Sequence, residues 1–184
     1  TAKTLLNLEM AATGEMLGLA TALRPDLVTL VPERREERTT EGGLDAAGQH
    51  ARLAEVKARL DGAGVALSLF IDPEPAQVAA AAALGVAAVE LHTGDFCHAG
   101  TEAARAAELR RLADAAAVAN ETTGLRLAAG HGLTRRNVGP LVAALPTLEE
   151  LNIGHALVAD AVYWGLPEAV ARFRRAIDEG AAAR

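Results

Sequence analysis

Short runs rich in leucine, valine and isoleucine alternate along this chain with longer segments of helical character. The apolar runs end at Glu9, Glu33, Asp72, His92, His131 and His155. The segments between them carry alanine, leucine, glutamate and arginine at helical spacing, which predicts crossover helices. Alternation of strand and helix implies parallel strands joined by right-handed crossovers, so the sequence predicts an α/β fold.

Capping residues and glycines set the expected bounds of the helices. Thr13 is expected to cap a helix that ends at Leu23, and Thr101 a long alanine-rich helix. The other expected helices are 46–60, one capped by Thr134, and the consecutive pair 156–164 and 166–177 on either side of Gly165.

The residues that end the predicted strands favour a closed barrel over an open sheet. Each run finishes on an acid or a histidine, and a barrel gathers all strand ends round one mouth. A six-stranded open sheet would also leave two unpaired apolar edges. The expected fold is therefore a TIM (β/α)8 barrel, with residues 1–184 as a single domain holding the last six βα units. Two N-terminal units are expected to be absent from this sequence.

Composition narrows the class of ligand. The net charge of -6 and an aromatic content of 3% argue against nucleic acid as a partner. A small anion remains compatible, because backbone N–H groups can bind it whatever the net charge. No apolar run has the length of a membrane span, no membrane partner is expected, and the expected location is the cytoplasm.

Two Gly-His turns follow the last two predicted strands. They are "AGHGLT", with His131, and "LNIGHA", with Gly154 and His155. Loops in these positions often bind phosphate in barrel enzymes. Gly154 would let the backbone approach a ligand closely, the next helix would offer unpaired N–H groups, and a histidine would supply a proton or a hydrogen bond. The turns therefore predict a phosphate site beside an acid-base group.

Two carboxylates lie within apolar runs, which is costly unless they are paired or face a polar cavity. These two carboxylates are Glu9 and Glu90. Two interpretations remain open for them: a place at the barrel mouth, or a structural salt bridge. Asp72 is expected to cap the helix that follows it. His92 could be a ligand, but the stretch "HTGD" that contains it is also typical of an ordinary turn.

The alternative to acid-base and phosphate-binding roles is a metal site built from His92, His131 and His155. No His-x-His or His-Glu-x-x-His motif occurs, so the spacing does not favour a metal. Cys97, which is the single cysteine, and the adjacent His98 are expected in a loop.

The ordered motifs "NLEMA", "LVPERREERTTEGGLD", "LFID", "ELHTG", "AGHGLT" and "LNIGHA" closely resemble the pyridoxine 5'-phosphate synthase family. This resemblance extends from Asn7 to the C-terminal helices. It implies a transferase of vitamin B6 biosynthesis that condenses 3-amino-2-oxopropyl phosphate with 1-deoxy-D-xylulose 5-phosphate, releasing phosphate and water. It also implies that no metal or organic cofactor is used, and that the chain forms a homo-oligomer, an octamer.

The resemblance also implies roles for individual residues. Glu9 would be a general base, His131 a proton donor and Glu90 a stabiliser of charged intermediates. The residues implied in substrate binding are Thr39 for the deoxyxylulose phosphate, and Gly132, Gly154 and His155 for the phosphate of the amino substrate.

The family's first two units end in "N-x-D-H" and "H-x-R", and neither motif is in this sequence. Two other hypotheses therefore stay open. One is a non-catalytic phosphate-binding or assembly subunit derived from the barrel, and the other is a metal-dependent phosphate-binding barrel enzyme such as a sugar-phosphate epimerase.

Overall fold

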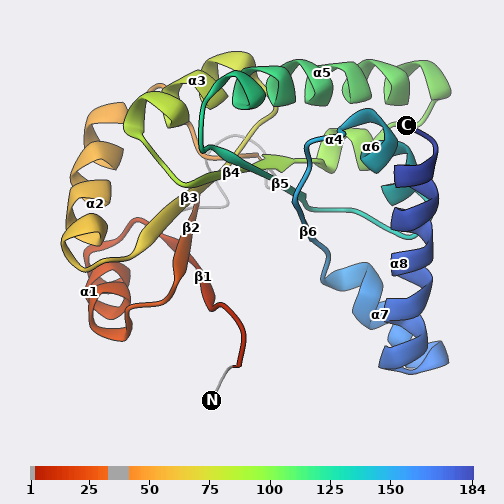
Figure 1. The fold of residues 1–184 in the computed structure, drawn as a ribbon, viewed down its shortest axis with the longest axis horizontal. Coiled ribbons are helices and arrows are strands. Elements are labelled where there is room, and N and C mark those ends of the chain that lie inside the picture. Colours follow the sequence, from red (N-terminus) through yellow and green to blue (C-terminus); the bar gives the residue numbers. More distant parts are fainter. Residues whose placement is uncertain (1–2, 33–41) are drawn as a thin grey trace.

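The computed structural model describes residues 3–32 and 42–184, so Glu33 and Thr39 lie outside the described residues. Within the described part, six parallel strands form one sheet in the order β1-β2-β3-β4-β5-β6. The strands are β1 (Asn7–Ala11), β2 (Leu27–Val31), β3 (Ala66–Ile71), β4 (Ala88–His92), β5 (Arg126–Gly130) and β6 (Glu150–Asn152). The sheet curves into half of a barrel, as expected for part of a TIM barrel, with helices around its outside (Figure 1).

The crossover helices follow one another round the convex side of the sheet (Figure 1). They are α1 (Gly14–Leu23), α2 (His50–Gly62), α3 (Pro75–Leu84), α4 (Gly94–His98), α5 (Glu102–Glu121), α6 (Val138–Ala144), α7 (His155–Trp164) and α8 (Leu166–Ala182). Thr13 and Thr101 accept backbone hydrogen bonds as the predicted caps of α1 and α5. Gly165 separates α7 from α8, as predicted.

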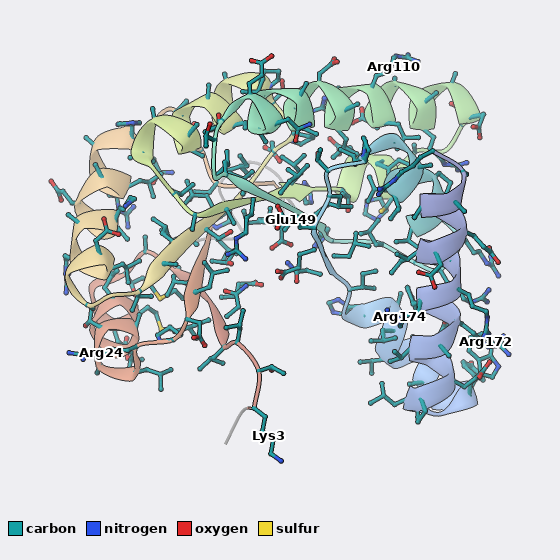
Figure 2. The ribbon with its side chains drawn as sticks, in the orientation of Figure 1. Lys3, Arg24, Arg110, Glu149, Arg172 and Arg174 are labelled. Atoms are coloured by element: carbon teal, nitrogen blue, oxygen red, sulfur yellow. The ribbon has the colours of Figure 1, made fainter. Side chains whose placement is uncertain are left out.

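The two faces of the sheet differ in chemistry because side chains alternate along every strand. The convex face carries the apolar core, in which Leu30, Leu69, Val89 and Leu91 are fully buried beneath the helices. The concave face carries polar side chains among smaller apolar ones. The register places Glu9 opposite Thr29 and Thr29 opposite Ser68 on this face, and a further pairing places Phe70 opposite Glu90. Figure 2 shows Arg110 on the outer surface of α5, pointing away from the sheet.

Two predicted helix starts were wrong. Residues 46–49 form a turn, and α2 begins at His50. The carboxylate of Asp45 accepts hydrogen bonds from the N–H of Gly48 and the side-chain amide of Gln77, and these bonds hold the turn outside the helix. Helix α6 begins only at Val138. Thr134 accepts a hydrogen bond from the N–H of Arg136 instead of capping a helix directly.

The segment with Cys97 and His98 was expected to be a loop, but it forms the short helix α4. Phe96 anchors this helix, because its ring is 1% exposed within the core. Burial of a large aromatic side chain stabilises a helix too short to persist alone.

Near the C-terminus, two guanidinium groups lie close to the ring of Trp164. Those of Arg135 and Arg172 are 5.0 Å and 4.0 Å from the centroid of its ring. Arg135 also contacts the carboxylate of Asp160 at 3.1 Å. These contacts join the segment before α6 to α7 and α8. In the described residues, no helix is both long and apolar enough to cross a membrane.

Candidate active site

A cavity of about 800 Å³ opens at the carboxyl ends of the strands, on the concave side of the sheet. Its lining includes residues from the two Gly-His turns and from inner positions of the strands. The predicted site residues that line it are Glu9, Glu90, His131, Gly132, Gly154 and His155. The sequence separates these residues by up to 146 positions, and the parallel sheet brings them to one cavity. Thr39, the other predicted site residue, lies outside the described residues.

Glu90 is the buried carboxylate of this cavity. Its side chain points inward from the middle of β4, and the residue is 6% exposed. The amide of Asn152, on β6, donates a hydrogen bond of 2.7 Å to Glu90 Oε2. Burial raises the pKa of Glu90 to about 7, although the Asn152 hydrogen bond acts in the opposite direction. Near neutral pH this carboxyl group can therefore both hold and release a proton.

Glu9 lies on the same inner face, on the edge strand β1. Unlike that of Glu90, its side chain is exposed, and it lines the cavity. The negative charge of Glu9 is one of the influences that raise the pKa of Glu90. The two carboxylates therefore differ in environment, one solvated and one buried, which is a usual basis for dividing acid and base roles.

His131 follows β5 in a backbone conformation that is uncommon for a residue with a side chain. Its φ is +80°, and the φ of Gly132 is +76°. The imidazole is exposed to the cavity, and its centroid lies 4.9 Å from that of His92. The turn thus directs a titratable ring toward the space that Glu9 and Glu90 also line.

His92 packs behind His131 as the last residue of β4. The ring is 6% exposed, lies edge-on to Phe70 at 5.3 Å, and places Nδ1 3.4 Å from Asp72 Oδ1. In the described part of the chain, Nε2 of His92 has no hydrogen-bond partner. A β-carbon on Gly94 would lie only 2.6 Å from this nitrogen, so the glycine makes room for the ring. His92 is therefore a buried neighbour of the cavity and not part of its lining.

Asp72 does not cap the next helix, and that prediction was wrong. The N-cap of α3 is Glu74, whereas Asp72 contacts His92 and accepts a hydrogen bond of 2.8 Å from the N–H of Gly43. The contact with His92, helped by that N–H group, holds the pKa of Asp72 below its ordinary value against the effect of partial burial.

The second Gly-His turn opens helix α7, with Gly154 at the N-cap and His155 as the first helical residue. Both residues are exposed and line the cavity. The first N–H groups of a helix lack intrahelical partners and carry partial positive charge. This arrangement can bind an anionic group beside His131.

Sequence reasoning did not single out four residues of the site. Asn152, Phe70 and His98 line the cavity, and Gly130 lies against the Glu90 carboxylate. Asn152 occurs within the quoted motif "LNIGHA", which was the available signal for it. Glu149, shown in Figure 2, lines a smaller cavity of about 140 Å³ deeper on the concave face.

The described residues hold no group of three or more His, Cys, Asp or Glu side chains arranged to bind a metal ion. Burial raises the pKa of the Cys97 thiol, and the thiol is therefore protonated near neutral pH.

Replacing Glu90 with glutamine should change how stability depends on pH. Because the folded-state pKa of about 7 lies above the ordinary 4.5, protonation of Glu90 stabilises the fold, and this contribution is lost as pH rises through about 7. The unfolding free energy should fall by on the order of 3 kcal/mol for this reason. Glutamine does not ionise, so the Glu90→Gln variant should lack this part of the fall. Urea unfolding at about pH 4.5 and about pH 8 should show a larger fall in unfolding free energy for the wild type. Equal falls in both proteins would contradict the raised pKa.

Comparison with known proteins places these features in a family. A family model described as "Pyridoxal phosphate biosynthesis protein PdxJ" matches residues 1–179. The pyridoxine 5'-phosphate synthase of a Synechococcus strain is 56% identical over 177 residues, which cover 96% of this chain and 73% of that protein. The protein of the same name from Xanthobacter autotrophicus is 54% identical over 182 residues, covering 97% of this chain and 70% of that protein.

Solved structures of distant sequence share the fold. The chain matches a native KDPGal structure with a TM-score of 0.61 at 15% identity, covering 98% of this chain and 71% of that one. It also matches a chain of the Amycolatopsis orientalis BexX/CysO complex with a TM-score of 0.58 at 21% identity, covering 90% of this chain and 59% of that one. At such identities the likeness concerns the fold alone.

Proposed function

This chain belongs to the PdxJ family of pyridoxal phosphate biosynthesis proteins, and from that membership and its cavity we propose that it forms pyridoxine 5'-phosphate. The substrates are 3-amino-2-oxopropyl phosphate and 1-deoxy-D-xylulose 5-phosphate, and phosphate and water are released. The observation that carries the proposal is the convergence of Glu9, Glu90 and His131 on one cavity whose rim includes the start of α7.

General acid-base catalysis supplies the chemistry. Closing the pyridine ring requires an imine, dehydrations and proton transfers among carbon, nitrogen and oxygen, so it needs both acids and bases. Glu9, exposed to the cavity, is the general base, and His131 is the proton donor. Glu90 is buried and ionises near neutral pH, so its carboxylate stabilises cationic intermediates.

The phosphate of the amino substrate binds at the two Gly-His turns. Gly132, Gly154 and His155 form this subsite, with the first N–H groups of α7 directed at the anion. Thr39 binds the deoxyxylulose phosphate. Neither a metal nor an organic cofactor takes part in the proposed reaction.

The six strands are the last six of an eight-stranded barrel in this proposal. The relatives' greater length and the half-barrel shape of the sheet (Figure 1) support a barrel with more than these six strands. In this proposal the active form of the protein is a homo-oligomer in the cytoplasm.

The test is product formation by the full-length natural protein. Incubation with both substrates should yield pyridoxine 5'-phosphate, detected by mass spectrometry, together with inorganic phosphate. Treatment with a metal chelator should leave the rate unchanged. Binding of both substrates without product would instead favour a non-catalytic phosphate-binding subunit. Loss of activity on chelation, restored by a divalent metal ion, would favour a metal-dependent barrel enzyme.

A further inference from the structure

The left-handed conformation of His131 needs support from the surrounding structure. A residue with a β-carbon pays a conformational cost at a φ of +80°, and such residues persist only where neighbouring contacts hold them. His131 is also exposed, so burial of its ring in the core does not provide that support. Contacts made by its backbone contribute to that support.

Thr93 makes those contacts. It follows β4 directly, is 0% exposed, and uses its hydroxyl to contact two consecutive carbonyl oxygens. The Oγ1 atom lies 2.7 Å from the oxygen of Gly130 and 2.6 Å from that of His131, so both carbonyl oxygens are within hydrogen-bond distance of the hydroxyl. The backbone N–H of Thr93 donates a further hydrogen bond of 2.9 Å to Gly130. Buried polar groups with such contacts fix local geometry strongly.

The surroundings leave little room for the turn to relax. Sheet register pairs His92 with Gly130, which brings Thr93 beside His131. A β-carbon on Gly132 would lie 2.9 Å from Cβ of Cys97, so this side of the turn is already in close contact with α4. Thr93 therefore joins the end of β4 to the turn at the end of β5.

We propose that Thr93 is a positioning residue, whose hydroxyl holds the Gly130–His131 turn so that the imidazole of His131 is directed into the cavity. The threonine does not line the cavity and acts through His131. This inference rests on the proposed function for its catalytic consequence, but the placement of the imidazole can be measured separately.

The experiment compares Thr93→Val, which removes the hydroxyl, with Thr93→Ser, which keeps it. The matched control is Thr21→Val. The hydroxyl of Thr21 also contacts two carbonyl oxygens, at 2.9 Å and 3.1 Å, but it lies on α1 and does not line the cavity. For each full-length protein, kcat and KM are measured, and the histidine imidazole signals are recorded by NMR. The signal of His131 is assigned from its loss in His131→Asn.

Thr93→Val should lower kcat about 10- to 100-fold with little change in KM, because a small misplacement of a catalytic group has effects of this size. The imidazole signal of His131 should shift or broaden, while that of His50, which begins α2 and does not line the cavity, stays unchanged. Thr93→Ser should restore kcat to within about threefold of the wild type. Thr21→Val should match the wild type.

Two results would overturn the inference. One is a folded Thr93→Val protein with the wild-type kcat and an unchanged His131 signal. The other, which applies even if the valine variant fails to fold, is a folded Thr93→Ser protein whose kcat and His131 signal differ strongly from the wild type. A wild type that forms no product would refute the proposed function, and the NMR comparison would still decide whether Thr93 positions the ring.

Discussion

His131→Asn should lower kcat about 1,000-fold, which lies within the usual contribution of a general acid or base. Asparagine cannot donate a proton as an imidazolium does, yet it tolerates positive φ better than most residues, so the turn should keep its shape. Binding of inorganic phosphate and the melting temperature should therefore remain close to wild type. Steady-state turnover, phosphate titration and thermal unfolding measure the three quantities.

His50→Asn is the matched control, because His50 is exposed at the start of α2 and does not line the cavity. It should leave all three quantities unchanged. Glu9→Gln should match His131→Asn in its effect, since it removes the proposed base without a large change in shape. A kcat within about tenfold of wild type in either variant would contradict the role assigned to that residue.

Gly130→Ala should reduce both the stability of the protein and its turnover. A β-carbon there would overlap with Glu90 Oε1 and lie 3.0 Å from Cβ of Asn152. The carboxylate would have to move, or β4, β5 and β6 would have to separate. We expect a destabilisation of about 1–3 kcal/mol, as for other overpacked interiors. We also expect kcat to fall about 100-fold because Glu90 is displaced.

The control for this substitution is Gly18→Ala on α1, where an added β-carbon meets none of the described atoms within 4 Å. This variant should be as stable as wild type or slightly more stable, because alanine favours a helix. Urea unfolding and turnover distinguish the two alanine variants. If Gly130→Ala kept both its stability and its turnover, the close packing of Glu90 against β5 would be refuted.

The strands were predictable because each contains a short apolar run, which is visible without any partner. Their predicted ends were less accurate, since β1 continues past Glu9 to Ala11 and His155 begins α7 instead of ending β6. The caps Thr13 and Thr101 were also predictable from the local sequence. The start of α2 was not, because it depends on a hydrogen bond between Asp45 and Gln77, which lie 32 positions apart. Helix α4 depends on burial of Phe96, and that burial is decided by the tertiary fold.

Some residues of the candidate site were also predictable from the sequence, and others were not. Glu90 stood out because a carboxylate within an apolar run needs a polar environment, and the Gly-His turns stood out because glycine allows close approach. The contribution of Asn152 depends on the pairing of β4, β5 and β6, which no local pattern reveals. The contacts of Thr93 reach carbonyl groups 37 and 38 positions away. Only the folded sheet makes these partners neighbours.

The alternation of side chains along β4 has a consequence for how this protein tolerates change. Glu90 faces the cavity and Leu91 faces the helices, so inserting one residue before them would exchange their places. Such an insertion would bury the Glu90 carboxylate in the apolar core and expose Leu91 to the cavity. The stability of the core and the chemistry of the cavity therefore depend on the same alternation of side chains. A one-residue shift of β4 would impair both.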